Sequence, residues 1–141
     1  MTDCVFCKIR DGQIPSVKVH EDERTLCFMD INPLNRGHCL VVTKRHGATI
    51  WESDEADLAA AIGTAKRVAL ALRAALQADG LNLLQANGPG AFQSVPHFHL
   101  HLIPRWLGDG KGFDWPIVPG DREVIAKAAE SIRAALGGRQ G

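Results

Sequence analysis

Apolar and polar residues alternate over several short stretches of the chain, and this period of two predicts β-strands. The stretch from Val17 to Leu26 indicates a strand, an acidic turn and the start of a second strand. The apolar run Leu26 to Asp30 stops at the turn sequence INPLNRG, which is rich in Pro, Asn and Gly. Three more strands are expected at residues 38–43, 81–86 and 97–103, the last flanked by Pro96 and Pro104.

A period of 3.6 residues replaces the alternation in two places and predicts helices. Apolar positions recur at this spacing from Leu58 to Leu76, after a capping residue at Ser53 or Asp54, and Asp79-Gly80 ends the helix. A second helix is expected from Arg122 to Leu136. Strands grouped around one long helix, with a helix closing the chain, predict an α+β fold with an antiparallel sheet. No repeat or long linker interrupts the chain, so residues 1–141 are expected to form a single domain.

The composition of the chain limits the kinds of molecule that it is expected to bind and the compartment in which it is expected to act. Of the 141 residues, 16 are basic and 16 are acidic, so no global positive field attracts nucleic acid or an anionic membrane. The N-terminus carries no apolar segment typical of a signal peptide, and no apolar run approaches the ~20 residues that span a bilayer. We therefore expect a cytoplasmic protein, with no nucleic-acid or membrane partner. In that compartment the four cysteines are expected to be thiols or metal ligands.

The stretch PHFHLHLIPR places three histidines at every second position, His97, His99 and His101. On a strand they share one face, while the apolar residues between them point into the core. Three interpretations compete: a solvent-facing strand, a zinc site made of three histidines, and phosphoryl chemistry. The zinc interpretation is weak, because the three positions spread over roughly 13 Å of extended chain. A neutral imidazole attacks phosphorus, and His99 is best placed because it has a histidine on each side.

This stretch resembles the signature of the histidine triad family, in which three histidines alternate with apolar residues and two apolar residues follow. The resemblance covers nearly the whole chain, through CVFCKIRDGQIPS, CFMDINPLNRGHCLVVTKRH and NGPGAFQSVPHFHLHLIPR. It is closest to the bacterial branch and to small hydrolases that act on nucleoside phosphoramidates and adenylated compounds. It implies the fold of that family, a five-stranded antiparallel sheet with one long helix and a C-terminal helix. It also implies a homodimer that joins two such sheets into one.

The resemblance assigns roles position by position. His99 matches the nucleophile that forms a nucleotidyl-histidine intermediate at the α-phosphate, and His101 matches a histidine that contacts the phosphate oxygens. Asp30 matches the acid that holds the ribose hydroxyls. His38 matches a further histidine on the phosphate side. Polar loop residues match Asn87, Gln93 and Ser94, and the apolar slot for the base matches Phe6, Ile9, Phe28 and Ile31. From the residues alone, the acid would equally be a turn residue and the apolar positions would be assigned to the core.

The pair Cys4 and Cys7 forms a CxxC motif with three interpretations: half a zinc site, a redox pair or coincidence. A redox pair would call for a βαβ context, which is missing from the pattern. Bacterial proteins that resemble this chain often hold a structural zinc, and their ligands match Cys4, Cys7, His46 and His97. Two thiolates and two imidazoles form the closed set that structural zinc prefers. His97 would then face the metal, while His99 and His101 face the phosphate.

We therefore expect a hydrolase that splits purine nucleoside monophosphate conjugates at the α-phosphate, with His97, His99, His101 and Ser94 in its catalytic group. The chemistry itself is expected to need no cofactor. Two alternatives stay open: a dinucleoside polyphosphate hydrolase or phosphorylase, and a nucleotide sensor without significant turnover.

Overall fold

The computed structural model describes residues 3–137, and the chain forms two units, Met1–Gly110 and Lys111–Gly141. The first unit begins with a short helix, α1 (Val5–Arg10), and its long helix is α2 (Glu55–Leu76). Its strands are β1 (Lys18–Glu21), β2 (Thr25–Met29), β3 (Cys39–Thr43), β4 (Gly80–Leu84) and β5 (His99–Arg105), with a 3-10 turn, η1 (Pro89–Ala91), before β5. That residues 1–141 form a single domain stays a prediction.

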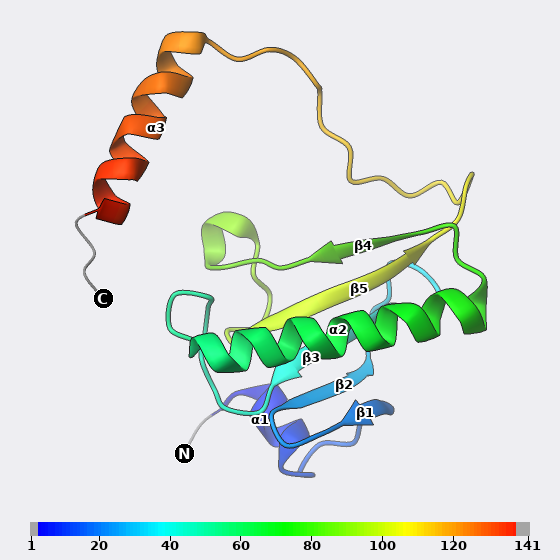
Figure 1. The fold of residues 1–141 in the computed structure, drawn as a ribbon. Coiled ribbons are helices and arrows are strands. Elements are labelled where there is room, and N and C mark those ends of the chain that lie inside the picture. Colours follow the sequence, from blue (N-terminus) through cyan, green and yellow to red (C-terminus); the bar gives the residue numbers. More distant parts are fainter. Residues whose placement is uncertain (1–2, 138–141) are drawn as a thin grey trace. The chain divides into compact units, whose positions relative to one another are not determined.

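The five strands form one antiparallel sheet in the order β1-β2-β3-β5-β4 (Figure 1). The predicted α+β class with a five-stranded antiparallel sheet is therefore confirmed. Each strand of the central pair β3 and β5 has a neighbour on both sides, whereas β1 and β4 lie at the edges. In the register between β3 and β5, Leu40 lies opposite His101 and Val42 lies opposite His99.

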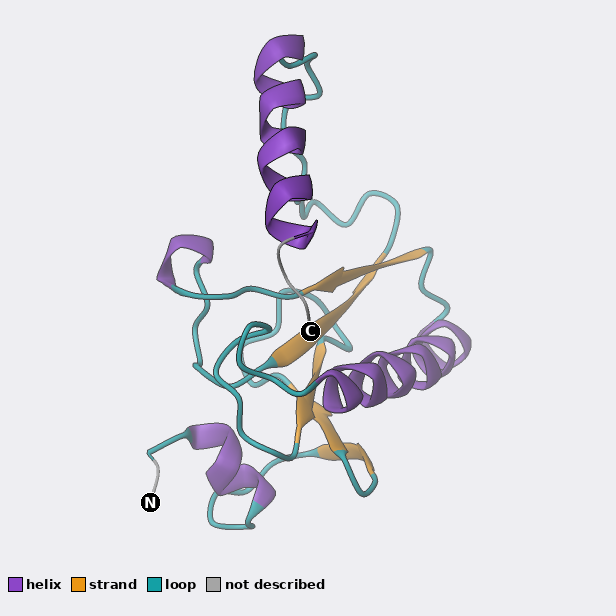
Figure 2. Ribbon diagram, turned by 60° about the vertical axis from the view of Figure 1, so that its left-hand side comes forward, coloured by secondary structure: helices purple, strands orange, loops and turns teal. Residues whose placement is uncertain are grey.

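The helix α2 covers one face of the sheet, and α1 packs on the other face (Figures 1 and 2). Under α2, Ala61, Ala65 and Val68 pack against strand residues that include Val41 and Leu102. Because side chains alternate along a strand, the intervening residues of β2 and β3 point to α1, where Leu26, Phe28, Leu40 and Val42 join Phe6 and Ile9. Strands β2 and β3 therefore supply core residues to both faces.

Three details of the first unit differ from the expectations. The helix α1 was not predicted, because six residues are too few to establish a helical period. The strand β5 begins at His99 and not at His97, whose backbone N–H donates to the carbonyl oxygen of Val95 in a turn. Pro104 lies within β5 and does not flank it. This is tolerated because β3 pairs with β5 only as far as Leu102, so proline faces no strand on that side.

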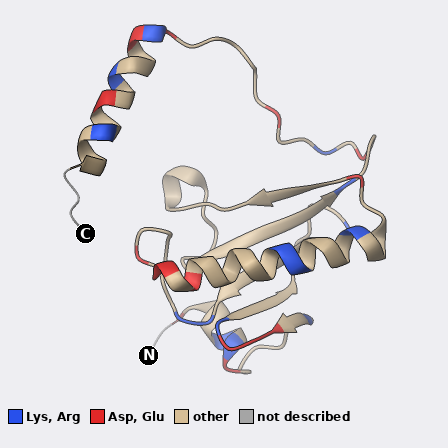
Figure 3. Cartoon of the chain, in the orientation of Figure 1, with Lys and Arg blue, Asp and Glu red and all other residues tan. Residues whose placement is uncertain are grey.

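The second unit contains α3 (Arg122–Gly137), close to the predicted helix. None of its described side chains is buried, and its larger apolar side chains, Val124, Ile125, Ile132 and Leu136, are exposed. Basic and acidic residues are interspersed along α3 and along the first unit (Figure 3). Among the described residues, no helix is long and apolar enough to cross a bilayer.

Candidate active site

Two of the three histidines point from β5 toward the α1 face of the sheet. The ring centroids of His99 and His101 lie 4.9 Å apart. The alternating residues Leu100 and Leu102 point to the opposite face, under α2, as the period of two predicts. The ring of His97 is fully buried and turns to the N-terminal cysteines instead. The triad is thus divided between two neighbouring sites.

The backbone fixes the tautomer of His99. Its Nδ1 lies 2.7 Å from the carbonyl oxygen of His97, and a carbonyl oxygen only accepts, so Nδ1 carries the proton. Burial lowers the pKa of His99, and the hydrogen bond to His97 opposes this effect. The side chain is therefore neutral near pH 7, and its Nε2 keeps a free lone pair. This is the form of histidine that acts as a nucleophile.

His101 has the opposite tautomer, which a chain of hydrogen bonds sets. The backbone N–H of Leu34 donates to Nδ1 of His38 at 2.9 Å, so neutral His38 carries its proton on Nε2. That Nε2 lies 3.0 Å from Nδ1 of His101 and donates to it. Neutral His101 therefore carries its own proton on Nε2. Burial, together with the neighbouring His99 and His38, lowers the pKa of His101 to about 4.

A cleft of about 300 Å³ opens beside these two histidines. Eight of the residues that the sequence assigned to catalysis or nucleotide binding line it: Phe6, Ile9, Phe28, Asp30, Ile31, Ser94, His99 and His101. Phe6 and Phe28 meet edge to face, with ring centroids 5.4 Å apart. Ile31 is 88% exposed and lies at the rim. The cleft thus has apolar walls and a group of polar residues, as ligand sites in proteins commonly do.

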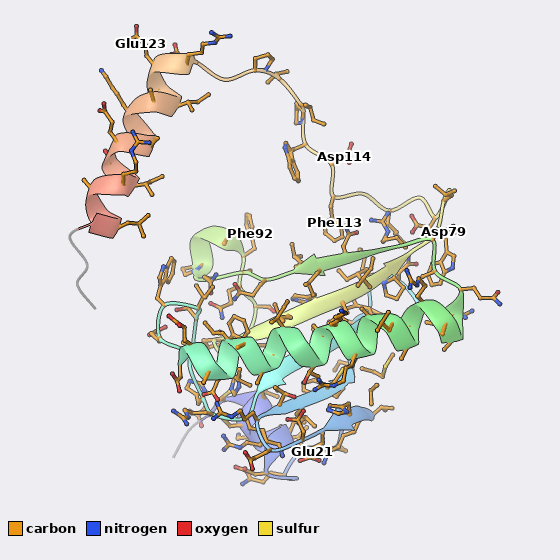
Figure 4. The ribbon with its side chains drawn as sticks, viewed as in Figure 1. Glu21, Asp79, Phe92, Phe113, Asp114 and Glu123 are labelled. Carbon is orange, nitrogen blue, oxygen red and sulfur yellow. The ribbon has the colours of Figure 1, made fainter. Side chains whose placement is uncertain are left out.

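Besides His97, three of the assigned residues do not line the cleft. His38 is buried behind His101 and lies 3.4 Å from a carboxylate oxygen of Asp30. The side chain of Asn87 accepts from the backbone N–H of Ile50, and that of Gln93 accepts from Gly88 and donates to Ala48 and Val95. These amides therefore hold the loop before β5 in shape, and of the three assigned loop residues only Ser94 lines the cleft. Phe92 projects from the same loop, beside η1 (Figure 4).

The structure brings Cys4, Cys7, His46 and His97 together, and one ligand atom from each lies within 4.8 Å of the others. The Nδ1 atoms of His46 and His97 are 3.1 Å apart. The sulfur of Cys4 is 3.3 Å from Nδ1 of His97, and the sulfur of Cys7 is 3.5 Å from Nδ1 of His46. Cys4 caps the N-terminus of α1, and Cys7 lies one turn further along the helix.

These distances fit one tetrahedral ion. Around zinc, bond lengths of ~2.0–2.3 Å place neighbouring ligand atoms roughly 3.3 to 3.8 Å apart. The tautomer of His97 also fits, because its Nε2 donates to the carbonyl oxygen of Thr43 at 2.6 Å. The Nδ1 lone pair therefore faces the cysteines, as in metal sites where an outer hydrogen bond orients the histidine. Cys4, Cys7, His46 and His97 are the residues that would hold a metal.

Sequence reasoning missed several parts of this arrangement. Leu40 and Val95 line the cleft, but an apolar residue in a strand or loop carries no sign of a ligand contact. The carbonyl of Thr43 and the N–H of Leu34 fix two tautomers, and backbone groups have no signature in a sequence. No local signal marked Leu40, because its place opposite His101 follows only from the pairing of β3 with β5.

Comparison with known proteins agrees with this geometry. The family model of the HIT domain matches residues 11–106. The chain is 43% identical to Protein hit of Bacillus subtilis over 114 residues, which are 80% of this chain and 79% of that protein. It is 37% identical to the adenosine 5'-monophosphoramidase hnt1 of Schizosaccharomyces pombe over 134 residues, covering 94% of this chain and 98% of that protein.

Solved structures show the same likeness. SMU.412c from Streptococcus mutans matches with a TM-score of 0.91 at 38% identity, covering 96% of this chain and 87% of that chain. A zinc-bound histidine triad family protein from Mycobacterium smegmatis matches with a TM-score of 0.76 at 37% identity, covering 96% of both chains.

Proposed function

This chain belongs to the histidine triad (HIT) family, and from that premise we propose that it hydrolyses purine nucleoside monophosphate conjugates at the α-phosphate. The observation that carries the proposal is the opposite tautomers of His99 and His101 at one cleft: one offers a lone pair and the other an N–H. Relatives of this chain are named adenosine 5'-monophosphoramidases and an adenylylsulfatase, and these names support the proposal.

The base and ribose of the nucleotide bind in the cleft, against its walls. Phe6, Ile9, Phe28 and Ile31 supply apolar surface for a purine ring. Asp30 lies where β2 ends, and one of its carboxylate oxygens accepts from the backbone N–H of Asn32. Its other oxygen, Oδ2, lies 3.4 Å from Nε2 of His38. Because Asp30 also lines the cleft, we assign its carboxylate to the ribose hydroxyls. A nucleotide held in this way presents its α-phosphate to the two histidines, and the N–H of His101 donates to a phosphate oxygen.

The reaction then proceeds in two steps. The Nε2 lone pair of His99 attacks the α-phosphorus, an N–P bond forms, and the bond from phosphorus to the leaving atom breaks. The leaving atom takes the bonding electron pair and a proton from a donor at Ser94 or His101. Water next attacks the phosphorus and the N–P bond breaks, so that the electron pair returns to His99 and one water proton restores the donor. The products are the free leaving group and the nucleoside monophosphate.

We further propose that the Cys4, Cys7, His46 and His97 site holds a structural zinc ion. Support comes from the tetrahedral spacing of the four ligand atoms and from the zinc-bound relative of Mycobacterium smegmatis. Zinc there would tie α1 to the segment that precedes β5. It would take no part in the chemistry at phosphorus, because the metal-facing Nδ1 of His97 points to the cysteines and not into the cleft.

A homodimer in the cytoplasm is the expected state of the protein. Exposed leucines on the edge strand β4, Leu81, Leu83 and Leu84, support pairing of two sheets along this edge. Size-exclusion chromatography with light scattering tests the dimer, and the mass of one chain would contradict it. The balanced charge gives no support for a nucleic-acid or membrane partner, so a nucleotide would be held by the local groups of the cleft.

A comparison of two substrates tests the proposed activity. The protein is assayed on an adenosine phosphoramidate with a fluorescent amine and on diadenosine tetraphosphate. Release of AMP from the phosphoramidate with a higher kcat/KM supports the proposal. Preference for the dinucleotide would favour a dinucleoside polyphosphate hydrolase or phosphorylase. AMP binding without turnover on either substrate would favour a sensor.

A further inference from the structure

The short helix α1 belongs to both sites at once. Cys4 and Cys7, at its start and in its first turn, supply half of the metal cluster, while Phe6 and Ile9 form part of the cleft wall. We propose that occupancy of the metal site sets the affinity of the cleft for its nucleotide, through the position of α1 and of the Phe6 ring. This inference rests on the proposed function, because it assumes both ligands.

Phe6 makes the physical connection. Its ring meets the His97 ring edge to face at 5.8 Å between centroids, and the His99 ring at 5.0 Å. It also meets Phe28, which lines the same cleft. One buried aromatic ring thus touches a metal-cluster histidine, the reacting histidine and the base slot. A displacement of α1 moves this ring relative to all three.

The helix has little stability of its own. A helix of six residues is far shorter than the length at which isolated helices persist in water. Its position therefore depends on tertiary contacts: the apolar packing of Phe6 and Ile9, and the cluster formed by Cys4 and Cys7. A metal bound to both cysteines and to His46 and His97 joins α1 to two segments distant in sequence. Without the metal, only weaker packing and hydrogen bonds hold the N-terminal end of α1.

A second connection runs along the backbone. The ring of His97 belongs to the metal cluster, and the carbonyl oxygen of the same residue accepts from Nδ1 of His99. Fixing the His97 ring between the cysteines and the Thr43 carbonyl also fixes the peptide that orients His99. The metal site therefore acts on both the base slot and the phosphate end of the cleft.

Coupling of this kind is reciprocal. If metal raises the affinity for the nucleotide by some factor, the nucleotide raises the affinity for the metal by the same factor. Couplings in proteins are commonly about 5- to 150-fold. We expect at least a fivefold effect here, because α1 supplies ligands to one site and a wall to the other. A metal that merely stabilised the overall fold would leave the AMP affinity of the folded apoprotein unchanged.

Two titrations on the full chain test the proposal. The first measures AMP affinity by calorimetry, with saturating zinc and after removal of metal by a chelator, at a temperature where circular dichroism shows both forms folded. The second measures zinc affinity by competition with a chromophoric chelator, with and without saturating AMP. The expected result is an AMP affinity at least fivefold higher with zinc, and a rise in zinc affinity by the same factor in AMP.

Matched variants separate the connection from general stability. His46→Asn removes an exposed ligand and is expected to give AMP affinity near that of the apoprotein, even with zinc added. His20→Asn removes an imidazole outside both sites and is expected to behave as wild type. Phe6→Leu keeps an apolar side chain but loses the ring contacts. In Phe6→Leu the ratio of AMP affinities with and without zinc is expected to approach one. The zinc affinity in the absence of AMP is expected to stay unchanged.

The outcomes distinguish this inference from the proposed function. AMP and zinc that both bind, with the same affinity whether or not the other is present, would overturn the coupling and leave the proposed function intact. AMP that does not bind at all would overturn both. In a third outcome zinc does not bind, AMP binds, and the protein still hydrolyses the phosphoramidate. This would overturn the coupling and the metal site but not the proposed hydrolase.

Discussion

Nε2 of His38 lies 3.0 Å from Nδ1 of His101, and this contact gives the buried His38 a function although it does not line the cleft. His38 keeps the proton of His101 on the nitrogen that faces the phosphate. The contact therefore predicts that His38 acts through His101 as a positioning residue.

Replacement of His38 by Leu removes this donor and is expected to lower kcat/KM by about 10- to 100-fold, the effect of a lost buried hydrogen bond of ~1–3 kcal/mol. His38→Gln places an N–H near the position of Nε2 and should recover part of the loss. The measurement is steady-state kinetics together with AMP affinity, and kcat is expected to fall more than AMP affinity. Equal losses in the Leu and Gln variants would show that His38 only fills space.

Metal removal is expected to destabilise the protein. At free zinc about 100 times its dissociation constant, binding to the native state adds about 3 kcal/mol to the free energy of unfolding. A chelator should therefore lower the Tm of wild type but not that of Cys7→Ser, which lacks a ligand. Cys39→Ala is the control, because Cys39 is a buried cysteine outside the cluster. Its Tm should respond to the chelator as wild type does. A Cys7→Ser variant that responds in the same way would exclude the metal site.

Burial of His101 predicts a dependence of stability on pH. Its pKa in the folded protein is about 4, below the usual value of 6.5, because burial and the neighbouring His99 and His38 oppose its charge, while Asp30 favours it. Between these two values the unfolded chain binds a proton that the folded protein does not. The free energy of unfolding therefore falls as the pH falls from about 6.5 to about 4.

His101→Asn removes this contribution, so its free energy of unfolding should fall less steeply over the same pH range. The difference in slope should correspond to at most one proton bound on unfolding. Urea unfolding at a series of pH values, with chelator present throughout to exclude metal release, measures the slope. An identical slope in both proteins would mean that His101 does not titrate below its ordinary range.

Phe92 adopts a left-handed backbone conformation, with φ at 60°, and its side chain is 91% exposed. A bulky residue in this conformation costs roughly 1–2 kcal/mol. Because the side chain buries little apolar surface, the hydrophobic effect offsets little of this cost. Phe92→Gly is therefore expected to raise the free energy of unfolding by about 1 kcal/mol after the entropy cost of glycine. Ala91→Gly, in η1 at ordinary φ, is the control and should lower stability. A loss of stability in Phe92→Gly would mean that the side chain makes contacts worth more than the strain.

The sequence predicts the strands and α2 well because their periods extend over several residues. Alternation along β5 places His99 and His101 on one face and Leu100 and Leu102 on the other, as observed. The start of the strand could not be found in this way, because His97 follows the same alternation but turns away through a hydrogen bond with Val95.

The site was predictable only in part, for a related physical reason. A CxxC motif and histidines show which groups could bind a metal, but the convergence of His46 and His97 on Cys4 and Cys7 depends on chain reversals with no local signature. The same holds for α1, whose six residues have no period, and for the backbone groups that set the tautomers. The cleft wall at Leu40 follows from strand pairing, which a single sequence does not reveal.

Detection of the covalent intermediate tests the central claim most directly. Wild type and His99→Ala are mixed with an adenosine phosphoramidate, quenched within milliseconds at high pH, where phosphohistidine persists, and digested for mass spectrometry. The account predicts an adenylyl group on His99 in wild type, and no adduct in His99→Ala, whose kcat falls by on the order of 10⁴-fold while AMP still binds. An adduct on another residue, or His99→Ala turnover near that of wild type, would contradict the assignment of His99 as the nucleophile.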